Sequence, residues 1–93
     1  MKTYKIKIRN IYEACQFVKI MEQVIGDVDL SCGSYKIDGK SIIGVISLAG
    51  NHILQLSIHE TLTPEIELEL ERFRRNVTSP STKINTNFYI RDD

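Results

Sequence analysis

Residues 40–48 read Lys40-Ser41-Ile42-Ile43-Gly44-Val45-Ile46-Ser47-Leu48, a short apolar run opened by a serine. A serine at this place is a good helix N-cap, because its hydroxyl accepts a hydrogen bond from a free N–H group of the first turn. At helical spacing Ile42, Val45 and Ile46 share one face with Ala49, whereas Ile43 lies on another. A short helix needs one apolar face to cover a sheet, so the additional apolar edge at Ile43 and Ile46 indicates a partner surface.

The residues before this run predict a strand, a helix and a hairpin. Residues 3–9 alternate basic and apolar side chains, as a half-buried strand does. Asn10 and Glu13 have the spacing of a capping box, which predicts a helix over residues 11–25 that Gly26 ends. The expected buried stripe of this helix comprises Ile11, Ala14, Cys15, Val18, Met21 and Ile25, widened by Phe17 and Val24. Strands at 28–32 and 35–37, joined by the turn Gly33-Ser34, then form the hairpin.

The residues after the run predict a strand at 53–58 and a helix at 64–77. The alternation within residues 65–71 also fits a strand, but two wider signals favour a helix. Thr63-Pro64 suits a helix start, and the apolar residues recur at intervals of four, three and four: Ile66, Leu70, Phe73 and Val77. The order is therefore βαββαβα. It predicts an α+β open-faced sandwich, in which helices cover one face of a four-stranded, mostly antiparallel sheet.

The chain of 93 residues is short enough to form one domain, which we place at residues 1–77. After Val77 the composition changes to serine, threonine and proline, which is typical of a linker. We therefore treat residues 78–93 as a C-terminal tail. The segment Asn87-Phe88-Tyr89-Ile90-Arg91 has strand-like residues without an assigned partner, so the tail is either disordered or supplies an added strand.

Composition excludes several classes of protein. Twelve basic and twelve acidic side chains balance each other, which argues against a general attraction to nucleic acid or anionic lipid. No apolar run is long enough to span a bilayer, and no signal peptide is evident. The two cysteines, Cys15 and Cys32, lack metal-like spacing; we expect both to be small buried side chains of a cytoplasmic protein.

Side chains suited to catalysis are scarce. His52 and His59 are seven residues apart, roughly 23 Å in an extended strand, which is too far to share a metal ion. The glutamates of residues 65–71 fit a solvated helix face. No phosphate-binding loop or nucleophile motif occurs. We therefore expect no enzymatic activity, no metal site and no cofactor.

The segment Lys-Ser-Ile-x-Gly-Val-x-Ser-Leu at residues 40–48, in this element order, resembles the regulatory-serine segment of HPr, the phosphocarrier of the bacterial sugar phosphotransferase system. The resemblance covers residues 1–77. In that family a histidine that carries phosphate opens the first helix, and an arginine assists it. Counting back from Ser41 without gaps places Asn10 at the histidine position and Tyr12 at the arginine position. Because an amide cannot replace imidazole as a phosphoryl acceptor, the chain resembles the catabolite-repression paralogue of HPr, which has lost phosphocarrier chemistry.

The resemblance implies that Ser41 is a regulatory phosphorylation site for HPr kinase/phosphorylase. It also implies a partner-binding surface of Lys40, Ile42, Ile43 and Ile46, with a transcriptional regulator or sugar-transport proteins as partners. A phosphate at a helix N-cap faces free N–H groups, which agrees with this role. Two alternatives stay open: an interaction module in which Ser41 serves only as a cap, and a phosphocarrier that uses His52 or His59. The oligomeric state also stays open.

Overall fold

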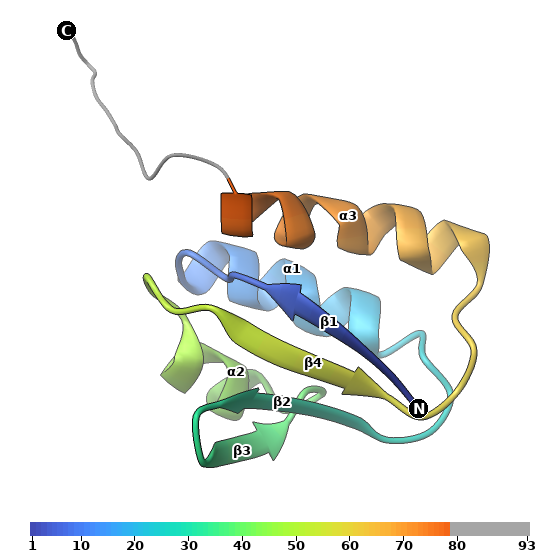
Figure 1. Cartoon of the computed structure of the whole chain (residues 1–93), viewed down its shortest axis with the longest axis horizontal. Coiled ribbons are helices and arrows are strands. Elements are labelled where there is room, and N and C mark those ends of the chain that lie inside the picture. The colour runs from blue at the N-terminus through green and yellow to red at the C-terminus, as the bar shows by residue number, and fades with distance from the viewer. Residues whose placement is uncertain (79–93) are drawn as a thin grey trace, which may run out of the picture.

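The computed structural model describes residues 1–78, and its elements follow one another in the predicted βαββαβα order (Figure 1). The strands are β1 (Lys2–Ile6), β2 (Val28–Cys32), β3 (Tyr35–Asp38) and β4 (Leu54–Ile58). The helices are α1 (Ile11–Met21), α2 (Ile42–Leu48) and α3 (Pro64–Thr78). The strand-like segment expected at residues 87–91 lies outside the described residues.

The four strands form one sheet in the order β1-β4-β2-β3, and each neighbouring pair is antiparallel. Leu56 of the central strand β4 lies opposite Tyr4 of β1 on one side and Leu30 of β2 on the other. These three side chains are buried beneath the helices, whereas Lys5 and Gln55 are exposed on the opposite face. The predicted open-faced sandwich is therefore confirmed, with a sheet that is antiparallel throughout.

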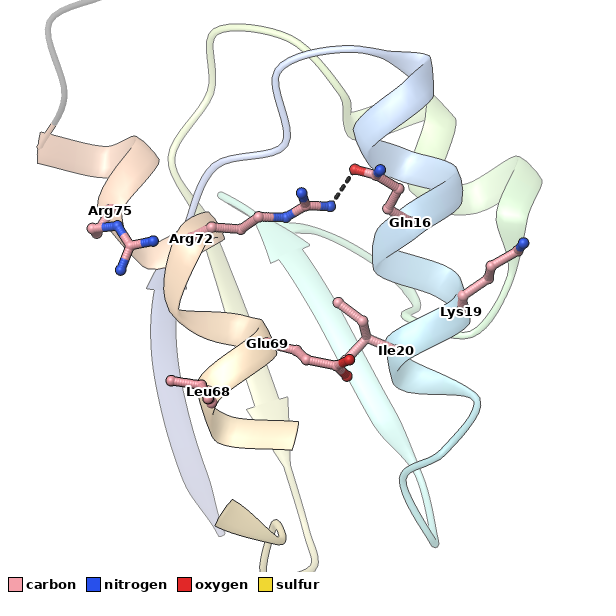
Figure 2. Close-up of a pocket in the computed structure, with 7 residues that line it drawn as sticks. All are labelled: Gln16, Lys19, Ile20, Leu68, Glu69, Arg72 and Arg75. Atoms are coloured by element: carbon pink, nitrogen blue, oxygen red, sulfur yellow. Dashed lines mark hydrogen bonds between the residues drawn. The ribbon is translucent and has the colours of Figure 1, made fainter. Parts of the chain in front are cut away.

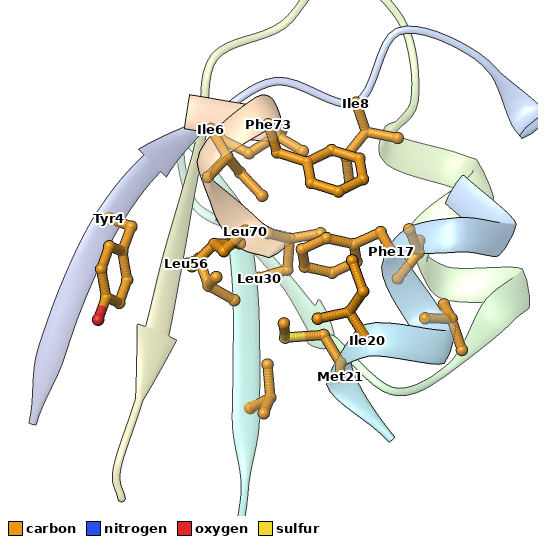
Figure 3. Close-up of a cluster of buried hydrophobic side chains, with 14 of the residues drawn as sticks. Tyr4, Ile6, Ile8, Phe17, Ile20, Met21, Leu30, Leu56, Leu70 and Phe73 are labelled. Carbon is orange, nitrogen blue, oxygen red and sulfur yellow. The ribbon is translucent and has the colours of Figure 1, made fainter. Parts of the chain in front are cut away.

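The core lies between the covered face of the sheet and the helices (Figure 3). Phe17 of α1 and Phe73 of α3 meet edge to face, with ring centroids 5.5 Å apart and an interplanar angle of 80°. Both rings are fully buried, so this contact fixes α1 against α3. Val45 and Leu48 are buried parts of the same cluster and attach α2 to it.

Helix α1 differs from its prediction in length and in part of its buried face. It ends at Met21, four residues before the predicted end, and Gly26 adopts its positive φ of 89° in the loop that follows. The exposed side chains include three that periodicity assigned to the buried stripe: Ile11, Cys15 and Ile25. Five predicted positions are buried: Ala14, Phe17, Val18, Met21 and Val24. Ile20, which the prediction left out, is buried with them, because the helix packs against α3 as well as the sheet. The prediction that both cysteines are buried was thus wrong for Cys15, and Cys32 is half-buried.

Candidate functional site

A tight turn places Ser41 at the start of α2. The Ser41 N–H donates to the Asp38 carbonyl at 3.0 Å, which closes the turn after β3. The Ser41 Oγ accepts a hydrogen bond from the Gly44 N–H at 3.2 Å. The predicted N-cap is therefore confirmed, and the hydroxyl oxygen of the half-buried Ser41 already satisfies one free donor of the first turn.

Lys40 ties this turn to the loop after α1. Its N–H donates to Asp38 Oδ1 at 2.9 Å, and its Nζ donates to the Val24 carbonyl oxygen at 2.6 Å. The Lys40 ammonium group is thus held by a backbone carbonyl of the loop after α1. The Asp38 carboxylate brings a negative charge to the same turn, so the electrostatic environment of Ser41 is mixed.

The exposed apolar surface of α2 centres on its first two residues. The side chain of Ile43 is 80% exposed and that of Ile42 is 38% exposed. Ile46 is half-buried and packs against the edge of the core, so it adds less apolar surface than these two residues. Helix α2 approaches the hairpin closely at Gly44, where an added Cβ would lie 3.3 Å from the Ile37 side chain. This close approach places α2 beside β3.

Asn10 caps α1 in the same manner as Ser41 caps α2. Its Oδ1 accepts from the Glu13 N–H at 2.8 Å, and both Asn10 and Tyr12 are exposed. Glu13 does not return a bond to the Asn10 N–H, as a capping box requires; its Oε1 accepts from the Arg9 N–H at 2.9 Å. The helix start predicted at Asn10 is therefore confirmed, whereas the reciprocal half of the box is shifted by one residue.

The carboxylate of Glu13 links α1 to the loop before it and to α3. Oε2 accepts from Arg9 Nη2 at 2.8 Å and from Arg9 Nε at 3.1 Å, and Oε1 accepts from Asn76 Nδ2 at 3.2 Å. Asn76, near the end of α3, also donates to the Lys7 carbonyl at 2.8 Å. Burial alone would raise the pKa of Glu13, but the hydrogen bonds from Arg9 and the positive charges of Arg9 and Arg72 outweigh it and lower that pKa.

Sequence reasoning missed this cluster of Arg9, Glu13 and Asn76. Two signals were present in the sequence. Arg9 and Glu13 have the i,i+4 spacing of an ion pair, and Asn76 follows Phe73 by three residues on the buried side of α3. The cluster fixes the start of α1 to the end of α3, so the polar groups at the start of α1 serve the fold.

The two histidines lie in different parts of the fold. The loop that holds His52 lies beside the segment before α1, since the Gly50 N–H donates to the Ile8 carbonyl at 2.8 Å and Lys7 Nζ donates to Asn51 Oδ1 at 3.1 Å. His52 is exposed in the loop after α2, and His59 is exposed beyond β4 with its Nε2 3.3 Å from Asp29 Oδ2. Within residues 1–78 no group of three or more histidine, cysteine, aspartate or glutamate side chains is placed to hold a metal ion. No helix of these residues combines the length and the apolar character needed to cross a membrane.

No protein-family profile and no curated protein sequence matches this chain. Solved structures do match it. The crystal structure of HPr-C-His from Thermoanaerobacter tengcongensis is 23% identical, with a TM-score of 0.65 over 82% of this chain and 93% of that one. A phosphocarrier protein HPr from Bacillus anthracis is 16% identical, with a TM-score of 0.56 over 80% of this chain and 90% of that one. The α+β sandwich described above is therefore the fold of HPr.

Proposed function

We propose that this chain is a non-enzymatic regulatory or binding protein, an HPr-like component of the sugar phosphotransferase system that recognises other proteins through the start of α2. The observation that carries the proposal is the exposure of Ile42 and Ile43 directly after the Ser41 cap. Single exposed isoleucines are ordinary on a soluble domain. Two in succession, beside a half-buried serine and a fixed lysine, make a compact surface that a partner protein can cover.

The surface proposed for this contact comprises Lys40, Ile42, Ile43 and Ile46. The isoleucines supply the apolar contact, and the Lys40 ammonium adds a charge at its edge. The partners proposed from the fold are those of HPr proteins: a transcriptional regulator, a sugar-transport protein and HPr kinase/phosphorylase. A cytoplasmic location belongs to the same proposal.

Phosphorylation of Ser41 is the proposed switch for this surface. A phosphoryl group would add between about −1.5 and −2 charges beside two exposed isoleucines, which changes what the surface can bind. The positive charge of Lys40 favours the modification, whereas the Asp38 carboxylate in the same turn opposes it. The balance between these two charges would set how stable the modified turn is.

A histidine phosphocarrier role is not part of the proposal. Asn10 stands at the start of α1, and its side-chain oxygen already accepts from the Glu13 N–H. An amide has no nucleophilic nitrogen equivalent to imidazole, so transfer of phosphate through this position is not expected. Neither alternative carrier, His52 or His59, stands at that helix start, although the loop of His52 lies beside the segment before α1 through the bond from the Gly50 N–H to the Ile8 carbonyl. Incubation with enzyme I and phosphoenolpyruvate tests them, since an acid-labile phosphate on either histidine would contradict this part of the proposal.

The Ser41 switch is tested by incubating the protein with HPr kinase/phosphorylase and ATP, followed by mass spectrometry. The expected result is one added phosphate that is lost in Ser41→Ala and kept in Ser47→Ala. Ser47 is a suitable control because it is an exposed serine on the same helix. If the chain gains no phosphate while an authentic HPr does under the same conditions, the switch is refuted.

A second function, an interaction module without phosphorylation, is favoured by the bond between Ser41 Oγ and the Gly44 N–H. Because that bond caps α2, Ser41 has a structural role that does not require phosphorylation. The two functions differ in one outcome: a module of this kind would bind its partner equally well before and after kinase treatment. In both cases Ile43→Ser is expected to weaken partner binding.

A further inference from the structure

Helix α3 has two sides that border different parts of the fold. On the side of α1, Arg72 reaches across a groove and donates a hydrogen bond to Gln16 (Figure 2). On the side of β1, a second hollow of about 450 Å³ lies between the helix and the outer edge of that strand. The residues that line it include Thr3, Tyr4 and Lys5 of β1 and Arg74, Val77 and Thr78 of α3. The last residue that the structure describes, Thr78, therefore lies at this hollow.

The edge of β1 that borders the hollow has no strand partner within residues 1–78. β1 is the first strand in the order β1-β4-β2-β3, so it pairs with β4 alone. An unpaired edge presents backbone N–H and C=O groups that can bind a further strand. Such pairing can extend as far as Ile6, because the next N–H group, that of Lys7, already donates to the Phe73 carbonyl at 3.0 Å.

The chain beyond Thr78 contains a segment with the sequence pattern of a half-buried strand. Residues 83–91 read Lys-Ile-Asn-Thr-Asn-Phe-Tyr-Ile-Arg. The even-numbered positions carry the more apolar side chains: Ile84, Thr86, Phe88 and Ile90. The odd-numbered positions carry charged or amide side chains apart from Tyr89. Alternation of this kind gives a strand one apolar and one polar face.

Helix α3 brings this segment to the edge of β1. The helix runs beside the strand in the same direction (Figure 1). Glu67 pairs with Lys2 at 3.5 Å near the start of β1, and Asn76 donates to the Lys7 carbonyl at 2.8 Å just after its end. A turn after Thr78 therefore returns the chain antiparallel to β1. The other outer strand of the sheet, β3, lies three strands away, about 14 Å.

We propose that residues 86–90 add a fifth strand to the sheet, antiparallel to β1 of the same chain, with Phe88 opposite Tyr4. In this register the apolar face of the segment continues the covered face of β1, on which Tyr4 and Ile6 are buried. The polar face continues the exposed face of the sheet, where Asn87 comes opposite Lys5. Both faces of the segment thus match the faces of the strand that it joins.

The aromatic side chains support this register. The Arg74 guanidinium lies 5.3 Å over the Tyr4 ring. Phe88 opposite Tyr4 makes an aromatic cross-strand pair beside that cation, and both kinds of contact are favourable. Because residues 79–85 tether the segment to α3, the pairing needs no second molecule and is expected to be independent of protein concentration. Helix α2 takes no part, so the inference stands independently of the proposed function.

Amide hydrogen exchange on the full chain, followed by NMR, tests the added strand. Every second backbone N–H of residues 86–90 faces β1 in an antiparallel pair. Relative to their intrinsic rates, these groups are expected to exchange about tenfold more slowly in the wild type than in Phe88→Asp, which puts a charge on the apolar face. Asn87→Asp is the matched control, because it puts the same charge on the exposed face opposite Lys5 and is expected to keep the slow exchange. Circular dichroism checks that each variant is folded.

An engineered disulfide tests the register. In a background of Cys15→Ala and Cys32→Ala, Thr3→Cys with Tyr89→Cys is expected to form a disulfide within one chain in a glutathione redox buffer, because the two positions come opposite each other. The matched control is Ser57→Cys with Tyr89→Cys. Ser57 lies opposite Thr3 in β4, one strand further in. It would be about 10 Å from residue 89, which exceeds the roughly 7 Å between Cα atoms that a disulfide can span.

Three results would overturn the inference. The first is exchange of residues 86–90 at the rates of an unpaired chain. The second is an equal effect of Phe88→Asp and Asn87→Asp on that exchange. The third is a disulfide between positions 3 and 89 that forms no more readily than the control, or that joins two chains, which would place the strand on a second copy.

Discussion

Replacing Glu13 by glutamine tests whether the carboxylate holds the start of α1 in place. The carboxylate accepts four hydrogen bonds: from Arg9 N–H, Arg9 Nε, Arg9 Nη2 and Asn76 Nδ2. Glutamine keeps one acceptor oxygen but turns an N–H group toward donors. Hydrogen bonds to charged groups contribute about 1.5–3 kcal/mol each, and water can replace part of this loss because the Arg9 side chain is half exposed. We expect the free energy of unfolding to fall by about 2 kcal/mol.

This loss is measurable by thermal unfolding followed by circular dichroism. In a domain of this size each kcal/mol shifts the midpoint by about 4–8 °C, so a decrease of roughly 8–16 °C is expected. Glu71→Gln is the matched control, because its carboxylate lies on the exposed side of α3, where it contacts Arg74 at 3.4 Å. Its expected effect is below about 0.5 kcal/mol.

The stability lost in Glu13→Gln is expected to depend on pH. Because folding lowers the pKa of Glu13, its charge stabilises the fold above the usual glutamate pKa of 4.5, and this stabilisation is lost as the pH falls through the folded value. The difference in stability between the wild type and Glu13→Gln should therefore narrow as the solution is made acidic. A difference that stays constant from neutral pH to about pH 3, or an effect no larger than that of Glu71→Gln, would refute the reasoning.

Three further predictions concern the turn and helix around Ser41, each measured by urea denaturation. Gly39→Ala should lower the free energy of unfolding by about 1–3 kcal/mol, because the new Cβ would lie 2.5 Å from Cγ1 of the buried Val28. An unchanged free energy of unfolding would contradict this clash. Ser41→Ala should lower the free energy of unfolding by about 1 kcal/mol, because the helix cap is lost. Ser41→Asp should lower it by less, since aspartate also caps a helix; equal decreases for the two variants would argue against capping. Ile43→Ser should change stability by less than about 0.5 kcal/mol while Val45→Ala costs about 2 kcal/mol; a large loss for Ile43→Ser would mean that its side chain is part of the core.

The order of the elements and the starts of α1 and α2 were predictable, because each depends on residues that are close together in the sequence. Alternation at period two identified β1, β2 and β4, and each cap needs only the residues within one turn of it. Ser41 and Asn10 both accept from the N–H three residues later, as their types and positions indicate. Hydrogen bonds between residues this close in sequence depend little on how the rest of the chain packs.

The buried face of α1 was predictable only in part. Its apolar residues cover a wide arc, with Ile11 and Cys15 at one edge, Ile20 at the other edge, and Phe17, which the sequence placed on the buried face, between them. Periodicity cannot choose between the two edges, since the choice depends on where α3 lies. The buried Phe73 ring, more than fifty residues away in the chain, packs against Phe17, so that Ile20 is buried and Cys15 is exposed. Glu13 was assigned to a capping box from its spacing, whereas its partners are Arg9 and Asn76 of α3.

The starts of α1 and α2 differ in the residue that caps them. At the start of α1, the Asn10 side chain caps the helix and Glu13 is held by Arg9 and Asn76, so the polar groups are committed to packing. At the start of α2 the cap is a serine, whose hydroxyl can also carry a phosphoryl group. Both starts expose apolar side chains: Ile11 and Tyr12 of α1 are 60% and 73% exposed, and Ile42 and Ile43 of α2 are 38% and 80% exposed. Exposure alone therefore does not distinguish the two surfaces. The reason for proposing recognition at Ile42 and Ile43 is that they follow a cap that can be modified.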